Sequence, residues 1–209
     1  MPNYINGLFL GEMSASTIVA GCIDIYENAF PDPEQAIDRI EQQCVNPDSP
    51  VKFCKAHIVG GQINQKFRTN DMYDITYGST LGDTVCQDVH NQMYTTLMAT
   101  TPAYFKKHNL DAMMYYENYH MLKYGVDTEY KQHYDDGPSM SRVVSAITYL
   151  NDDYEGGELE FPNFKIKIKP KAGMLLLFPS SYAYAHKAHP VTSGTKYAIV
   201  TWIHDEPIK

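Results

Sequence analysis

Three side chains that can bind a metal ion lie in the second half of the chain: His133, Asp135 and His186. On a β-strand the side chains of residues i and i+2 share a face, so His133 and Asp135 can point at one ion while Tyr134 points away. The third ligand must come from another strand, and His186 stands at the start of a later strand-like run. Two imidazoles and one carboxylate form a facial set for Fe(II) that leaves coordination positions open for a substrate and O2. The residues therefore predict a non-haem iron oxygenase core.

A lysine follows His186 by ten residues, on what we expect to be an apolar face. The run KYAIVTWI is typical of a buried strand, and its period of two places Lys196, Ala198, Val200 and Trp202 on one side. A lysine in such a position is costly unless it meets an anion. A dicarboxylate that chelates iron at one end would bring that anion at its other end. In the alternative interpretation, Lys196 begins the strand and its ammonium group reaches water.

Three segments of this region carry a family resemblance. They read YGVDTEYKQHYD at residues 124–135, YLNDDYEGGELEFP at 149–162 and HKAHPVTSGTKYAIVTW at 186–202. In this order they resemble the catalytic core of prolyl 4-hydroxylases, which are 2-oxoglutarate- and Fe(II)-dependent dioxygenases. The resemblance implies that His133, Asp135 and His186 are the iron ligands. It also implies that Lys196 binds the distal carboxylate of 2-oxoglutarate and that the hydroxyl of Tyr149 supports it.

The resemblance extends to four further pocket residues. Tyr124 matches an aromatic position on the cofactor side, whereas Tyr130, Arg142 and Trp202 match positions near the substrate cleft. Collagen-type members of the family have lysine at the position of Lys196, whereas oxygen-sensing members have arginine, whose planar fork binds a carboxylate differently. On that one residue the sequence resembles the collagen-type pocket, which does not establish a collagen substrate.

A second histidine, His189, competes with His186 as the third ligand because it lies only three residues later. Aligned on the following PVTSGTKY, the resemblance places the ligand four residues before the proline, which is His186. We therefore expect His189 to lie outside the first coordination sphere.

The resemblance implies an enzyme that hydroxylates a proline in a flexible or extended peptide and releases succinate and CO2. Its implied cofactors are Fe(II) and 2-oxoglutarate, with ascorbate as a reductant. Two alternatives stay open. One is a 2-oxoglutarate oxygenase that hydroxylates another residue or a small molecule, since the core motifs alone do not dictate proline. The other is a cupin-like metal-binding protein without turnover.

Composition narrows the classes of partner. The formal net charge of −8 argues against a protein that tracks nucleic-acid phosphates. Four cysteines lie outside the motif-rich half and form no CxxC pair, so we expect reduced thiols without zinc or disulfides. The apolar run before Cys22 is interrupted by Glu12 and is too short for export or spanning, so we expect a cytoplasmic protein without a membrane partner.

The predicted fold is mainly β, of the α+β class, with a double-stranded β-helix core, also called a jelly roll or cupin-like fold. We expect one domain over residues 1–209, in which 1–112 form a helical and loop-rich support and 113–206 form the core. Helices are predicted over 33–44, with Asp32 as N-cap, and over 83–108, where Pro102 could kink the helix. Residues 68–82 are predicted to form a mobile lid, with an ordinary surface loop as the alternative.

Strand signals follow one another through the second half of the chain. VVSAITYL and ELEF are bounded by turn residues, and AGMLLLFP is an unbroken apolar run that predicts a central strand. In FKIKIKP, lysines alternate with apolar residues, which is typical of an edge strand protected by charge. Earlier in the chain, CIDIYENAF alternates enough to form a strand.

Overall fold

The computed structural model describes residues 4–5, 8–9, 16–58, 62–110, 115–137 and 141–208. Its helices are α1 (Pro33–Val45), α2 (Ile75–Thr80) and α3 (Thr84–Lys107), with 3-10 turns at Pro162–Phe164 and Tyr182–Tyr184. The strands before the core are β1 (Tyr4–Ile5), β2 (Leu8–Phe9), β3 (Thr17–Ala20), β4 (Ile23–Tyr26), β5 (Cys54–Lys55) and β6 (Asp71–Asp74). Those that follow are β7 (Tyr115–Tyr116), β8 (His120–Tyr124), β9 (Tyr130–His133), β10 (Arg142–Tyr149), β11 (Glu155–Gly156), β12 (Leu159–Phe161), β13 (Ile166–Ile168), β14 (Leu175–Pro179), β15 (His186–Ala188), β16 (Val191–Ser193) and β17 (Lys196–His204).

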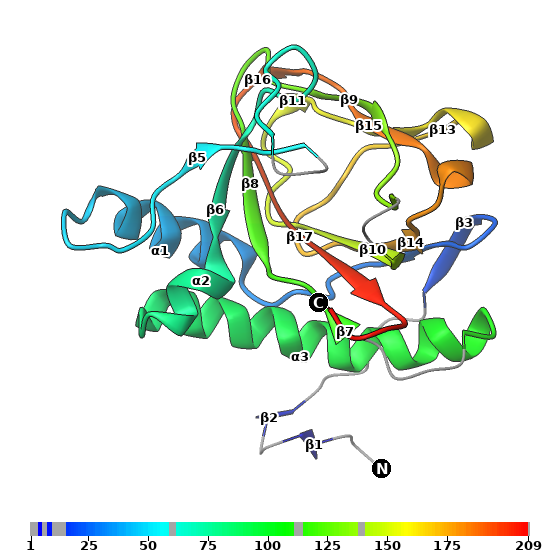
Figure 1. The fold of residues 1–209 in the computed structure, drawn as a ribbon, viewed down its shortest axis with the longest axis horizontal. Coiled ribbons are helices and arrows are strands. Elements are labelled where there is room, and N and C mark those ends of the chain that lie inside the picture. Colours follow the sequence, from blue (N-terminus) through cyan, green and yellow to red (C-terminus); the bar gives the residue numbers. More distant parts are fainter. Residues whose placement is uncertain are drawn as a thin grey trace.

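A nine-stranded sheet forms the base of the core, in the order β3-β4-β14-β10-β17-β8-β6-β5, with β7 beside β17. A four-stranded sheet, β13-β12-β15-β9, faces it, and a small β11-β16 pair lies at one end (Figure 1). The pairings between these strands are antiparallel. The predicted α+β class with a jelly-roll core and N-terminal helices is confirmed.

The two central strands β14 and β17 are buried on both faces, which explains their continuous apolar sequences. In β14, Leu175 and Leu177 face the helices, while Leu176 and Phe178 face the interior between the two sheets. Such alternation follows from the period of two along a strand. The unbroken apolar run therefore became a central strand, as predicted.

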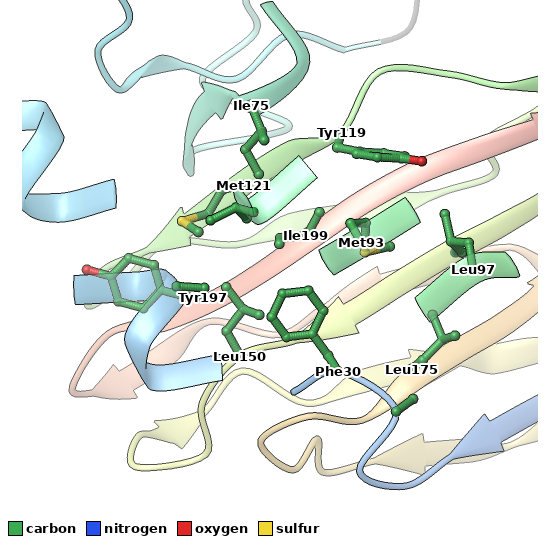
Figure 2. Packing of buried hydrophobic residues seen from close by; sticks show 14 of the residues in the cluster. Phe30, Ile75, Met93, Leu97, Tyr119, Met121, Leu150, Leu175, Tyr197 and Ile199 are labelled. Carbon is green, nitrogen blue, oxygen red and sulfur yellow. The ribbon is translucent and has the colours of Figure 1, made fainter. Parts of the chain in front are cut away.

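The helices pack together on the outer face of the large sheet (Figure 1). Met93 and Leu97 of α3 contact the same cluster as Met121 and Ile199 of the sheet, as Figure 2 shows. Full burial of each such side chain stabilises the fold by about 1.5–3 kcal/mol. This helix layer is the support that holds the sheet, and with it the strands that carry the site.

Both predicted helices are present, with two differences in detail. Asp32 stands at the N-cap position and Pro33 begins the helix, as predicted, but Asp32 has a left-handed backbone and its side chain makes no capping bond. The second helix starts at Thr84, where the Asp83 carboxylate accepts a bond from the Cys86 amide, and it continues through Pro102. No described helix has the length and apolarity needed to cross a membrane.

The predicted lid over residues 68–82 is wrong. Residues 71–74 form β6, paired with β8 inside the large sheet, and residues 75–80 form α2 against α3. Tyr73 and Ile75 are fully buried there. Polar residues and glycine hide this short strand and helix in the sequence, because tertiary contacts, not local propensity, stabilise them. The predicted boundary at residues 112 and 113 lies outside the described residues.

Candidate metal centre and cofactor pocket

The structure brings His133, Asp135 and His186 together at the mouth between the two sheets. One ligand atom from each lies within 4.8 Å of the others, a spacing that could hold one metal ion. The Nε2 atoms of His133 and His186 lie 3.5 and 3.7 Å from the Asp135 carboxylate. The two histidines face each other across the β9–β15 pairing, which brings together residues far apart in sequence.

Asp135 lies beyond the end of β9, not on the strand as the i, i+2 argument assumed. Its backbone N–H donates to the carbonyl of Ser180, at 3.0 Å, and this bond directs the chain back toward the site. The Ser145 hydroxyl donates to Asp135 Oδ2 at 2.6 Å and also bonds the Ser180 hydroxyl at 2.9 Å. The carboxylate is therefore held by Ser145 of β10, and the backbone of Asp135 by Ser180 just after β14, rather than by the pleat of β9.

Each histidine is held with Nε2 turned toward the cluster. Nδ1 of His133 donates to the carbonyl of Lys131 at 2.8 Å, and Nδ1 of His186 donates to the carbonyl of Tyr184 at 3.1 Å. Because a carbonyl oxygen only accepts, each Nδ1 carries a proton, and Nε2 is the nitrogen left to face the cluster. Such backbone partners are typical of metal-binding histidines.

Burial and mutual charge set the ionisation of the cluster. Burial alone would raise the pKa of Asp135, but His186, His133 and the Ser145 hydroxyl together place it well below its usual range. Burial, followed by the charge of His133, lowers the pKa of His186 to about 4. At neutral pH the cluster therefore contains an ionised carboxylate and a neutral His186 imidazole, which are the forms that bind metals.

A buried ammonium group stands at the other end of the same cavity. Lys196 is only 2% exposed and, with Ala198, Val200 and Trp202, lines the cavity, so the predicted face of β17 is confirmed. Its Nζ donates to the carbonyl of Gly157 at 2.6 Å. Among the described residues it forms no ion pair with a carboxylate. Burial, and next the charge of Lys169, lowers the pKa of Lys196 to about 7.

The environment of Lys196 fits an organic carboxylate. Its Nζ lies 5.1 Å from the ring centre of Tyr149 and 5.2 Å from that of Tyr124. The Tyr149 hydroxyl is buried and has no hydrogen-bond partner in the described structure. A buried hydroxyl without a partner and a buried cation without a counter-ion are both costly, and one carboxylate would satisfy both. The residues present therefore fit a ligand with its anionic end at Lys196.

Gly157 lets the backbone approach this lysine. Its φ is +64°, and a Cβ at this position would lie 2.9 Å from the Tyr154 ring and 3.2 Å from Lys196 Cδ. A side chain at position 157 would displace the lysine. Glycine is therefore needed here both for the positive φ of the turn and for the space that Lys196 occupies.

Tyr130 is stacked on His133, with ring centres 3.5 Å apart and planes 16° apart. The guanidinium of Arg68 lies 4.5 Å from the same ring, and this arginine is buried and lines the cavity. Sequence reasoning placed Tyr130 in the pocket but treated Arg68 only as the start of a lid. No sequence pattern distinguished Arg68 from an ordinary loop arginine.

Arg142 and Trp202 meet beside the metal cluster. The Arg142 guanidinium lies 3.7 Å from the Trp202 ring centre and donates to both carboxylate oxygens of Glu117, at 2.6 and 2.7 Å. His204 bonds the same carboxylate. Trp202 lines the cavity, whereas Arg142 lies behind it and donates to the backbone carbonyl of Asp135 at 3.3 Å. Glu117 was missed by sequence reasoning because nothing in the ENYH segment marks it as a partner of Arg142.

His189 lies outside the cluster. Its Nε2 is 2.6 Å from the Glu160 carboxylate, on the four-stranded sheet. His186 is the histidine that the fold places beside His133 and Asp135.

A jelly roll whose mouth holds two histidines, an aspartate and a buried lysine defines a class of oxygenase. Residues 119–204 match the family model described as the 2OG-Fe(II) oxygenase superfamily, and this part of the chain belongs to that superfamily. Its relatives include prolyl hydroxylases. The chain is 33% identical over 119 residues to "Probable prolyl 4-hydroxylase 9" of Arabidopsis thaliana, covering 43% of this chain and 41% of that protein.

A second relative is prolyl 3-hydroxylase 2 of Homo sapiens, 38% identical over 72 residues, which are 32% of this chain and 10% of that protein. The chain thus spans less than half the length of either relative. A similar fold is found in a prolyl hydroxylase of Trichoplax adhaerens, solved with a peptide fragment of the hypoxia inducible factor oxygen degradation domain. The TM-score is 0.67 at 22% identity, covering 88% of this chain and 83% of that one.

Proposed function

We propose that this chain is an Fe(II)- and 2-oxoglutarate-dependent dioxygenase that hydroxylates a prolyl residue of a peptide or protein. The observation that carries the proposal is the buried Lys196, without an acidic partner in the described structure, in the cavity that His133, Asp135 and His186 also line. One end of this cavity fits a divalent metal and the other fits a carboxylate. 2-Oxoglutarate has both a chelating end and a distal carboxylate.

The chain's own residues would bind, orient and shield the reactants. His133, Asp135 and His186 would hold Fe(II), and Lys196 with Tyr149 would hold the distal carboxylate. Bound together with O2, iron and 2-oxoglutarate supply the oxidising chemistry and yield succinate and CO2. Leu122, Val200 and the rings of Tyr124 and Tyr130 make most of the cavity wall apolar, which keeps water from the reacting centre.

The prolyl substrate is supported by the names of the relatives and by the lysine at position 196. Relatives named prolyl 4-hydroxylases and prolyl 3-hydroxylases both match, so the 4-position is the part of the proposal that most needs a product analysis. Ascorbate as a reductant stays a prediction. Hydroxylation of another residue or a small molecule is the second candidate, because the core motifs alone do not dictate proline.

The test is an anaerobic titration of the Fe(II)-loaded protein with 2-oxoglutarate, followed through the visible charge-transfer band of a chelated 2-oxo acid. We expect the band in the wild type. In Lys196→Ala the concentration for half-saturation should rise roughly 10- to 100-fold, because a charged contact of about 1.5–3 kcal/mol is lost. Lys167→Ala, an exposed lysine of the edge strand β13, is the matched control and should titrate like the wild type. A folded wild-type protein without the band would point to the metal-binding alternative.

The substrate assignment needs a second measurement. Proline-containing and proline-free peptides of otherwise equal composition are incubated with Fe(II), 2-oxoglutarate, O2 and ascorbate. We expect succinate in step with the gain of one oxygen atom on the proline-containing peptide alone. Equal oxidation of both peptides would favour another target residue, and fragment spectra would identify the hydroxylated carbon.

A further inference from the structure

The strand pairing that holds Lys196 ends on one side just before this residue. β10 pairs with β17 as far as Tyr149 and Ala198, and the Leu150 N–H still donates to the Tyr197 carbonyl. On the other side, Lys196 pairs with Tyr124 of β8. Beside Lys196, where the backbone of β10 would otherwise continue the pairing, the side chain of Asn151 makes the hydrogen bonds instead.

The carboxamide of Asn151 bonds the two backbone groups that flank Lys196. Its Oδ1 accepts from the Tyr197 N–H at 2.8 Å, and its Nδ2 donates to the Thr195 carbonyl at 2.7 Å. A residue of a neighbouring parallel strand would make the same two kinds of bond, to the residues before and after its partner. The side-chain amide therefore replaces a missing strand residue opposite Lys196.

The orientation of this amide is determined by a third bond. Nδ2 also donates to Asp153 Oδ1, at 2.6 Å, so both amide hydrogens meet acceptors and the amide oxygen meets a donor. Asn151 is only 8% exposed, and in the flipped orientation the three bonds would be lost. A fully satisfied buried amide of this kind fixes local geometry more than a surface bond does.

The same segment of chain then holds the head of the lysine. Gly157, six residues after Asn151, accepts from Lys196 Nζ. The segment 151–157 thus fixes the backbone of Lys196 at one end and its ammonium group at the other.

We propose that Asn151 is a positioning residue for the binding of the 2-oxo acid. It places Lys196 so that the lysine reaches a distal carboxylate, and it does not touch the ligand itself. The inference rests on the proposed function, since it takes the partner of Lys196 to be the distal carboxylate of 2-oxoglutarate.

The experiment compares two 2-oxo acids on the anaerobic Fe(II)-loaded protein, by calorimetry and by the chelate band. 2-Oxoglutarate has a distal carboxylate and pyruvate has none, although both chelate through the same group. In Asn151→Ala we expect 2-oxoglutarate to bind roughly tenfold more weakly, because two bonds that hold Lys196 are lost. Pyruvate should bind as it does to the wild type, because the metal cluster is untouched.

Asn151→Asp is the second variant and is closest in shape to the native residue. It keeps the acceptor for the Tyr197 N–H but places a carboxylate oxygen against the acceptors Thr195 O and Asp153 Oδ1. The two hydrogen bonds that Nδ2 donates are therefore lost. We expect the same selective loss for 2-oxoglutarate. Asn46→Ala is the matched control, because the Asn46 side chain also bonds a backbone amide, that of Asp48, at an exposed turn after α1.

The possible outcomes separate the inference from the function on which it rests. If the wild type fails to prefer 2-oxoglutarate over pyruvate, the role of Lys196 is wrong and the inference fails with it. If the wild type prefers 2-oxoglutarate and a folded Asn151 variant keeps that preference, only the positioning role is wrong. Equal weakening for both acids would also overturn it, since that marks general damage to the site.

Discussion

At the scale of single residues, the site combines groups whose ionisation is set by burial and by neighbouring charges and hydrogen bonds. The lowered pKa values of Asp135 and His186 keep both side chains in the forms that bind metal. Burial also lowers the pKa of Lys196, because it disfavours the charged ammonium form. Strongly shifted pKa values gathered in one cavity are typical of functional sites. The two predictions at this scale concern the carboxylate and the lysine.

Replacing Asp135 by alanine should abolish turnover. The loss of the anionic ligand leaves two neutral imidazoles, so iron affinity should fall by more than about a hundredfold, although some binding by the histidines can persist. Succinate formation and iron content after gel filtration measure the two effects. Asp136→Ala is the control, because the Asp136 side chain lies outside the cluster and caps the Gly137 amide. Full activity in Asp135→Ala would remove this residue from the metal site.

Binding of 2-oxoglutarate should be linked to proton uptake near neutral pH. Without ligand the pKa of Lys196 is about 7, so above this pH the amine is largely neutral. A bound carboxylate favours the charged form and raises this pKa, so the complex takes up a proton and affinity falls as pH rises above about 7. Below pH 6 the lysine is already charged and uptake should vanish.

Calorimetry in two buffers of different ionisation enthalpy measures the number of protons taken up. Lys196→Ala should show no uptake at pH 8. Wild-type binding without uptake at that pH would mean that the amine stays charged in the free protein.

At the scale of elements, short segments of strand and helix hold the site where local sequence signals are weak. The strand β6 and the helix α2 lie in a stretch rich in polar residues, which led to the prediction of a lid. Gly78 of α2 packs on Cys86 of α3, and a Cβ at position 78 would overlap the Cys86 sulfur.

Gly78→Ala should therefore destabilise the protein by about 1–3 kcal/mol, as overpacking of a buried contact does. Thermal unfolding should show a midpoint lowered by several degrees, about 2–4 °C per kcal/mol for a chain of this size. Thr80→Ala, at an exposed position of the same helix, is the control and should shift the midpoint much less. If residues 68–82 were a mobile lid, the two variants would behave alike.

At the scale of the whole molecule, the sequence was most informative where one periodicity spans a long element. The residues on the cavity face of β17 and the central position of β14 could be predicted from the sequence. Both strands are buried on two faces, and such strands have nearly continuous apolar sequences. The cluster of His133, Asp135 and His186 could be read from residue types and from the family resemblance. The hydrogen bonds that hold Asp135 could not be predicted, because Ser145 and Ser180 contact it only after distant strands pair.

The same limit applies to Asn151, Glu117 and Arg68. Each makes its decisive contact with a residue far away in the chain, and no local pattern marks such a partner. Asp32 shows a different limit: the local signal gave the position of the N-cap, but the left-handed backbone leaves its side chain without a capping bond.

Strand β17 is shared between two layers that face in opposite directions. Lys196, Ala198, Val200 and Trp202 line the cavity, while Tyr197, Ile199 and Ile203 belong to the cluster under the helices. Inserting or deleting a single residue near the start of this strand would turn every shifted side chain to the opposite face. Lys196 would then lie under the helices and an apolar residue would lie in the cavity. Over evolutionary time the length of this strand is therefore constrained from both sides at once. Changes in length should accumulate instead in surface turns, such as the one after α1, where an added residue shifts no buried face.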